Sequence, residues 1–212
     1  MNKYNPNIHH RRSVRLKEFD YSCEGLYFIT ICCHERVCWF GNIENDNMIL
    51  NEVGQMIRKW YYELENKFPD IKCHEMIIMP NHFHCIIQNI SASKSVGANL
   101  CVRPDNFDCL DKSINQNNTI SLVDDVSKEN IKGEHIGSPL HCVVQWFKAM
   151  TTNEYIRGVK QLGWEPFNGK LWQRNYYEHI IRNGNSYIRF AQYINNNPSN
   201  WHEDKLFEEK IV

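Results

Sequence analysis

Two strand-like runs separated by only two residues constrain this chain more than any other feature. Residues 71–79 are rich in β-branched and other apolar side chains, and a second run begins at His82 and continues as Phe-His-Cys-Ile-Ile. Pro80 and Asn81, both common in turns, are all that connects the two runs. Strands joined by so short a link must be antiparallel neighbours. The sequence therefore predicts a pair of antiparallel strands here.

Two histidines occupy alternate positions of the second strand. Because successive side chains of a strand point to opposite faces, His82 and His84 share one face. Phe83, Cys85 and Ile87 share the other face, whose apolar character predicts packing against a core. The two imidazoles lie about 6–7 Å apart at the backbone and could bind one cation together. An exposed strand face that carries two histidines by chance is the alternative, because His-x-His is a short motif with many false matches.

The surrounding pattern alternates strands and helices. A β-branched and aromatic run at 25–33 predicts a strand, which continues through a short break to 37–41. Apolar residues recur at intervals of three and four over 52–67 and again over about 140–158, which predicts two helices that each bury one side. The order strand, helix, strand, strand, helix indicates an α+β fold, an antiparallel sheet with helices packed on one face in a ferredoxin-like arrangement.

Composition excludes several classes of protein. With 212 residues, of which 42% are hydrophobic, the chain can bury a sizeable core. No apolar run approaches the ~20 residues of a membrane span, and the N-terminus has no signal-peptide core. The nine cysteines include no Cys-x-x-Cys pair, and several lie in apolar runs. This usage favours buried thiols in a reducing cytoplasm over disulfides or a zinc knuckle.

Charge and composition also divide the chain into segments. Residues 1–20 form a basic arm suited to pairing with phosphates, although a solvated, frayed end is an equal alternative. Residues 91–139 are polar and without periodicity, which indicates a long insertion that we expect to be mobile. Residues 21–90 and 140–201 are then one domain, and residues 202–212 are a C-terminal tail. The basic side chains of the arm that are candidate DNA contacts are Arg11, Arg12, Arg15 and Lys17.

The last helical segment carries a tyrosine and an amide on one face. A helix that begins near Asn185 and ends at Pro198 places Tyr193 and Asn197 four residues apart and therefore side by side. A phenol and an amide then point together from the end of this helix. On this segment alone, the alternative is a partly buried tyrosine with an asparagine near an ordinary helix end.

Three motifs in a fixed order give the chain a resemblance to a known family. They are Met79-Pro80-Asn81-His82-Phe83-His84, the run 171–183 that begins Leu-Trp-Gln-Arg-Asn-Tyr-Tyr, and Tyr193-Ile194-x-x-Asn197-Pro198. Together they resemble the single-tyrosine HUH transposases, and most closely the REP-associated tyrosine transposases. HUH denotes His-hydrophobe-His. The resemblance covers about residues 11–201 apart from the insertion.

The resemblance implies a fold, a site and an activity. The fold is a ferredoxin-like (RRM-like) sheet, with the histidines on a central strand and a tyrosine on a C-terminal helix that faces them. Tyr193 is implied to be the nucleophile, His82 and His84 to be metal ligands, and Asn197 to be a third ligand. The implied metal is Mg²⁺ or Mn²⁺. The implied activity cleaves and rejoins single-stranded DNA through a 5′-phosphotyrosine intermediate, on repeats that form hairpins.

Three other tyrosines are rivals for the role of nucleophile. Tyr187 precedes Tyr193 by six residues and so lies about 120° away around the helix, off the face shared with Asn197. Tyr176 and Tyr177 follow Trp-Gln-Arg in a segment expected to position the chain and the DNA. Tyr193 alone has an implied metal ligand four residues further on, which favours it.

Single-stranded or hairpin DNA is the expected partner, because unpaired bases can stack on aromatic side chains. Arg174 and Arg182 join the arm as candidate phosphate contacts, although Arg182 fits a structural ion pair equally well. The sequence leaves open whether the protein assembles as a homodimer. Two alternatives to a transposase remain, a metal-dependent hydrolase and a domesticated, non-catalytic binder of hairpin DNA. Formation of a covalent adduct with DNA would exclude both.

Overall fold

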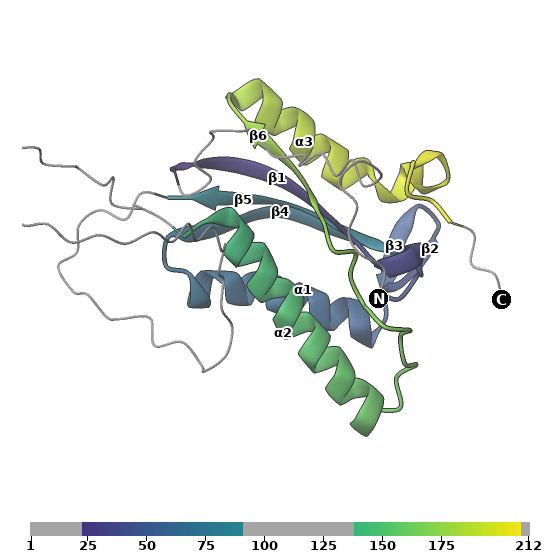
Figure 1. Ribbon diagram of the computed structural model, residues 1–212. Helices are drawn as coiled ribbons and strands as arrows, with labels where there is room; N and C mark the ends of the chain where they lie inside the picture. The colour runs from purple at the N-terminus through teal and green to yellow at the C-terminus, as the bar shows by residue number, and fades with distance from the viewer. Residues whose placement is uncertain (1–22, 91–137, 209–212) are drawn as a thin grey trace, which may run out of the picture. The chain divides into compact units, whose positions relative to one another are not determined.

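Four antiparallel strands form the main sheet of the computed structural model, which describes residues 23–90 and 138–208 (Figure 1). They are β1 (Gly25–Cys32), β4 (Ile71–Met79), β5 (His82–Asn89) and β6 (Tyr177–Ile181). Their order across the sheet is β4-β5-β1-β6, and every neighbouring pair is antiparallel. The α+β class with an antiparallel sheet that the sequence predicts is confirmed, and Met79 pairs with His82 on either side of the predicted turn.

The helices divide between the two faces of the sheet. α1 (Glu52–Lys67) and α2 (Leu140–Gln161) cover one face, and α3 (Gly184–Asn196) lies across the other (Figure 1). The first two helices thus pack on one face, as the periodicity indicates, whereas α3 faces the histidines. Asn51 caps α1 by accepting a hydrogen bond from the Gly54 N–H at 2.9 Å. Asn183 caps α3 in the same way, with the Ser186 N–H at 2.8 Å.

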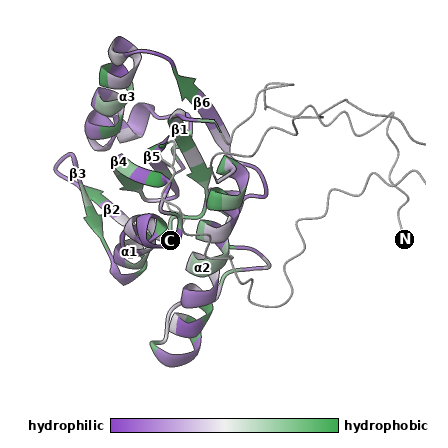
Figure 2. Ribbon diagram, turned by 90° about the vertical axis from the view of Figure 1, so that its left-hand side faces the viewer, coloured by the Kyte–Doolittle hydropathy of each residue, from purple (hydrophilic) through white to green (hydrophobic). Residues whose placement is uncertain are grey.

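Alternation along the strands produces two separate cores. Side chains that point toward α1 and α2 form the larger one, which contains Tyr27, Ile29, Ile31, Phe83, Cys85, Ile87, Ile57, Leu64, Val143 and Phe147. The side chains between them in sequence form a smaller core with α3, around Ile86, Ile181 and Ile194. In Figure 2 the sheet strands carry much of the hydrophobic colour, whereas much of α3 is hydrophilic. The predicted core face of β5 is confirmed.

A small hairpin replaces the predicted strand at 37–41. β2 (Gly41–Glu44) pairs with β3 (Asn47–Leu50), and positive φ angles of 49° and 60° at Asn45 and Asp46 form the turn between them. The prediction at 37–41 is wrong because the Phe40 backbone bonds to Pro80 and Asn51 instead of to a strand of the main sheet.

The predicted arm lies wholly outside the described residues, and the predicted insertion lies outside them except for its last two residues. Residues 1–20 and 91–137 lie outside them, and so do the four basic residues of the arm, so the division of the chain into arm, insertion and tail stays a prediction. Just before α2, both the N–H and the hydroxyl of Ser138 donate to Asp70. None of the helices in the part of the chain that the structure describes is long and apolar enough to cross a membrane.

Candidate metal and nucleophile site

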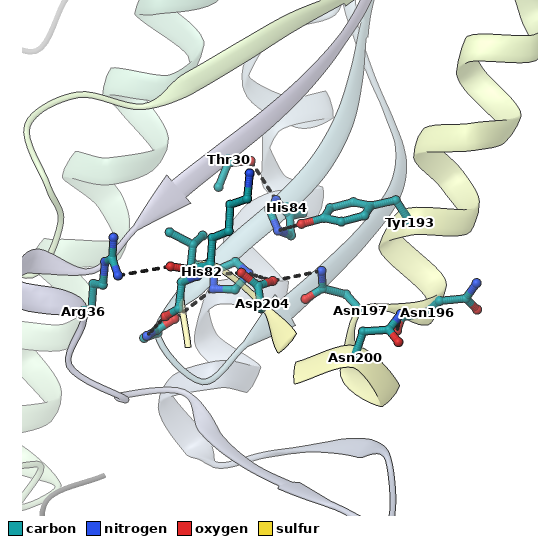
Figure 3. Close-up of polar contacts among 12 residues, drawn as sticks. Thr30, Arg36, His82, His84, Tyr193, Asn196, Asn197, Asn200 and Asp204 are labelled. Atoms are coloured by element: carbon teal, nitrogen blue, oxygen red, sulfur yellow. Dashed lines mark hydrogen bonds and ion pairs between the residues drawn. The ribbon is translucent and has the colours of Figure 1, made fainter. Parts of the chain in front are cut away.

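The histidine pair lies in the middle of the sheet, on the face that α3 covers. β5 has β4 on one side and β1 on the other, so neither imidazole is near a sheet edge. The ring centroids of His82 and His84 are 4.5 Å apart. Both side chains are buried, with 0% and 2% of their surface exposed. Figure 3 shows the Tyr193 hydroxyl pointing toward His84, with His82 near Asp204.

Each imidazole is held through its Nδ1 atom. Nδ1 of His82 lies 2.8 Å from Oδ1 of Asn81, which can only accept, so this nitrogen carries the proton. Nε2 of His82 therefore presents a lone pair. Nδ1 of His84 lies 2.7 Å from the hydroxyl of Thr30, its partner across the strands, and leaves Nε2 directed toward Tyr193. Such outer contacts fix the orientation of metal-binding histidines.

Asp204 adds a carboxylate to the pair. It follows η2 (Pro198–Glu203), and its Oδ2 lies 4.0 Å from Nε2 of His82. One ligand atom from each of His82, His84 and Asp204 can be chosen so that all lie within 4.8 Å of one another. The Leu206 N–H donates to Asp204 Oδ1 at 2.7 Å, and the Asn81 amide donates to the Leu206 carbonyl at 2.8 Å. Asn81 therefore orients His82 and anchors the segment that carries Asp204.

Asn197 and Tyr193 approach the cluster from the end of α3. Asn197 is 2% exposed and donates from Nδ2 to Asp204 Oδ2 at 3.3 Å, which leaves its Oδ1 facing the cluster. The hydroxyl of Tyr193 lies 3.4 Å from Nε2 of His84, and the side chain is 44% exposed. The structure thus brings together all four residues that the sequence assigns to metal binding and nucleophilic attack (Figure 3).

The chemistry of the donor atoms fits a divalent cation. Among the described residues, Nε2 of His82 and Oδ1 of Asn197 are buried without a hydrogen-bond partner, although buried polar atoms are nearly always paired. Burial lowers the pKa of His82 to about 3, and the Asn197 amide opposes this only in part. Burial also lowers the pKa of His84 well below its usual value. Both imidazoles are therefore neutral at pH 7, the form that binds metals.

The environment keeps the Tyr193 phenol protonated at neutral pH. Burial raises its pKa, the Asp204 carboxylate raises it further, and the Asn197 amide acts in the opposite direction. A free phenol already ionises only near pH 10. A nucleophile at this position therefore needs a positive charge beside it to stabilise the phenolate that develops.

A groove of about 1030 Å³ adjoins the cluster. Tyr193, His84, Asn197 and Asp204 line it, together with Glu203. Its other aromatic and cationic lining residues are Phe28, Tyr177, Phe190, Arg36, Arg189 and Lys205. Tyr177 is 56% exposed at the sheet edge. Flat rings beside cations are the features that bind a single nucleic-acid strand.

Comparison with known proteins places the chain in a family. A protein of Haemophilus influenzae, described as an uncharacterized protein, is 38% identical to it over 208 residues, which are 97% of each chain. The chain belongs to the same family as this protein. No protein-family model matches the chain.

Two solved structures are similar to this member of the family. One is the REP-associated tyrosine transposase bound to a REP hairpin, with a TM-score of 0.48 and 16% identity, over 94% of this chain and 73% of that chain. The other is a proposed transposase from Deinococcus radiodurans, with a TM-score of 0.39 and 12% identity, over 86% of this chain and 97% of that chain.

Arg174 and Arg182, the two arginines expected to bind DNA that lie within the described residues, do not line the groove. Arg174 is exposed in the loop before β6, and Arg182 lines a different hollow near the start of α3. Sequence reasoning also missed Asp204, which lies in the segment assigned to the tail. No spacing or periodicity around His-Glu-Asp after the helix-ending Pro198 could have indicated it.

Proposed function

We propose that the protein is a metal-dependent DNA strand transferase that cleaves and rejoins single-stranded DNA through a 5′-phosphotyrosine on Tyr193. The observation that carries the proposal is the position of the Tyr193 hydroxyl, 3.4 Å from one histidine of a buried His-His-Asp cluster. A tyrosine with only a structural role has no need of this neighbourhood. The order of the three sequence motifs supports the same function.

The chemistry of the four proposed ligand atoms favours Mg²⁺ or Mn²⁺ as the cofactor. His82 and His84 would each supply a neutral nitrogen, Asp204 a negative oxygen and Asn197 its unpartnered amide oxygen. Nitrogen and oxygen donors together suit first-row divalent metals, and carboxylate and amide oxygens suit Mg²⁺. When bound there, the cation would polarise a phosphoryl oxygen and stabilise the charge that develops in the reaction.

Tyr193 performs the covalent step. Its oxygen forms a bond to phosphorus, the bond from phosphorus to the 3′ oxygen breaks, the phenol loses its proton to solvent, and the departing oxygen gains one. The phosphotyrosine keeps the energy of the cleaved bond, so another 3′-OH can attack it and restore the phenol. The partial exposure of Tyr193 leaves its hydroxyl open to a phosphate in the groove.

The groove supports a single strand as substrate. Arg36, Arg189 and Lys205 can pair with phosphates, and the exposed ring of Tyr177 can stack on a base. Bases stacked within a duplex are closed to such contacts. The proposed substrates are therefore single-stranded segments beside hairpin-forming repeats, as the motif resemblance suggests. We keep Arg174 and Arg182 as further proposed contacts to DNA phosphates outside this groove.

An adduct assay tests the function. The protein is incubated with 5′- or 3′-labelled single-stranded hairpin DNA and Mn²⁺, and denatured products are separated on a gel. We expect a protein–DNA adduct that Tyr193→Phe abolishes and that Tyr62→Phe, the matched loss of one hydroxyl from an exposed tyrosine outside the groove, retains. Cleavage without adduct that persists in Tyr193→Phe would establish a hydrolase. Tight binding of hairpin DNA with no cleavage at any metal concentration would establish a non-catalytic binder.

A further inference from the structure

β4 contains a bulge beneath α3. Cys73 pairs with Ile87 and Met76 with Cys85, so two residues of β4, His74 and Glu75, stand opposite Ile86 alone. A bulge re-aims the side chains of the strand that carries the extra residue. Here both His74 and Glu75 reach the same side chain of α3, Tyr187.

A buried tyrosine holds the bulge from the opposite face of the sheet. Tyr61 of α1 is fully buried, and its hydroxyl lies 2.8 Å from the Ile86 carbonyl and 3.1 Å from the His74 carbonyl. These are backbone acceptors at the irregular step of the ladder. The large core thus satisfies the backbone of the bulge, so the bulge is a built feature of the fold.

Tyr187 connects α3 to this bulge. Its hydroxyl donates to Oε2 of Glu75 at 2.5 Å and lies 3.3 Å from Nδ1 of His74. Nε2 of His74 in turn lies 3.0 Å from Oε1 of Gln88 on β5. Hydrogen bonds to a carboxylate are about twice as strong as neutral ones. Burial and then Glu75 raise the pKa of Tyr187 to about 12, so the hydroxyl keeps the proton that it donates.

The remaining attachment of α3 to the sheet is thin. Ile194 is its one buried residue, Phe190 and Ala191 are partly buried beside it, and the core on this face is the smaller of the two. Tyr187 and Tyr193 lie on the same helix, about 9 Å apart along its axis. A shift of the helix therefore moves the Tyr193 hydroxyl relative to His84. Displacements of about 1 Å at a reacting group can lower a rate about 100-fold.

We propose that Tyr187, Glu75 and His74 form a latch that fixes α3 on the sheet and so sets the position of the Tyr193 hydroxyl over the histidine pair. Tyr187 is then a positioning residue, and its hydroxyl serves the fold of the site instead of attacking DNA. The role assigned to Tyr193 rests on the proposed function, whereas the attachment of α3 does not.

Two variants and a control test the latch in the full-length protein. Tyr187→Phe removes the donor, Glu75→Gln keeps an acceptor oxygen, and Tyr62→Phe removes the hydroxyl of an exposed tyrosine outside the latch. We expect Tyr187→Phe to slow single-turnover adduct formation about tenfold, with affinities for Mn²⁺ and single-stranded DNA within about twofold of wild type. Glu75→Gln should retain most of the rate, and Tyr62→Phe all of it.

A double variant and an exchange measurement separate the latch from the chemistry. Glu75→Ala alone and Tyr187→Phe alone each break the hydrogen bond between Tyr187 and Glu75, so the double variant Tyr187→Phe with Glu75→Ala should be no slower than the slower of these two single variants. Amide hydrogen exchange in α3 should quicken in Tyr187→Phe and stay unchanged in Tyr62→Phe. Unchanged exchange in Tyr187→Phe would overturn the latch even if the wild-type protein forms no adduct. Faster exchange with a wild-type adduct rate would overturn its role in positioning Tyr193.

Discussion

The two faces of the sheet use the same strands for opposite purposes. Toward α1 and α2, β5 presents Phe83, Cys85 and Ile87 to a large apolar core. Toward α3, the same strand presents His82 and His84 to a cluster that includes a carboxylate and unpartnered buried atoms. Apolar burial stabilises the fold, whereas burying polar groups costs stability unless they gain partners. The apolar face therefore supplies stability that offsets the cost of burying the polar cluster on the other face.

The largest expected effect comes from the apolar face. Phe83 stacks on Phe147 with ring centroids 5.3 Å apart and contacts Tyr61 at 5.4 Å. Phe83→Ala should lower the free energy of unfolding by about 3–5 kcal/mol, since it removes a buried ring and leaves a cavity. Urea denaturation measures this loss. A loss below about 1 kcal/mol would mean that this face is not the stabilising one.

The neighbouring residue on the polar face should behave in the opposite way. His84→Ala removes a proposed metal ligand, whose ring stacks on Phe28 at 5.3 Å, but that ring is smaller than the one removed in Phe83→Ala, so we expect an unfolding free energy within about 1–2 kcal/mol of wild type. Adduct formation with Mn²⁺ should fall below detection, while DNA binding changes little because phosphate contacts dominate affinity. Denaturation, adduct and binding assays on one preparation measure the unfolding free energy, the adduct yield and the DNA affinity. An adduct that survives in His84→Ala would break the contrast between the faces.

Substitutions of Asp204 and Asn197 compare the contribution of a charged oxygen with that of a neutral oxygen to metal binding on the polar face. Asp204→Asn keeps the shape but removes the one negative charge of the proposed donor set, and should weaken Mn²⁺ binding about 10- to 100-fold. Asn197→Ala removes a neutral oxygen, and its effect should be smaller. Isothermal titration with Mn²⁺ measures both affinities. The reverse order would assign the principal oxygen donor to Asn197, which the motif resemblance implies to be the third ligand.

The smallest effects should come from the matched caps of α1 and α3. Asn51→Ala and Asn183→Ala each remove one side-chain acceptor from a helix start and should lower the unfolding free energy by about 1 kcal/mol. Only Asn183→Ala should also slow adduct formation, because α3 carries Tyr193. Thermal unfolding and single-turnover rates give the two quantities. Equal rates in both variants would show that the thin attachment of α3 does not limit the site.

Local periodicity accounts for what could be predicted of the fold. The two-residue turn at Pro80-Asn81 sets the antiparallel pair, and alternation along β5 separates His82 and His84 from the core residues. The failed strand at 37–41 has the same apolar composition as real strands. Its backbone finds partners in Pro80 and Asn51, which a local pattern does not contain.

The sequence by itself determined strands β1, β4 and β5, the three helices, the shared face of His82 and His84, and the shared face of Tyr193 and Asn197, because these follow from periods of two and 3.6 residues within short windows. Only the tertiary structure decided that Asp204 joins the histidines and that Arg36, Arg189 and Lys205 line the groove. Those contacts join segments far apart in the chain. They depend on how the C-terminal residues fold back, where the Asn81 amide binds the Leu206 carbonyl, and such closure leaves no periodic signal in the sequence.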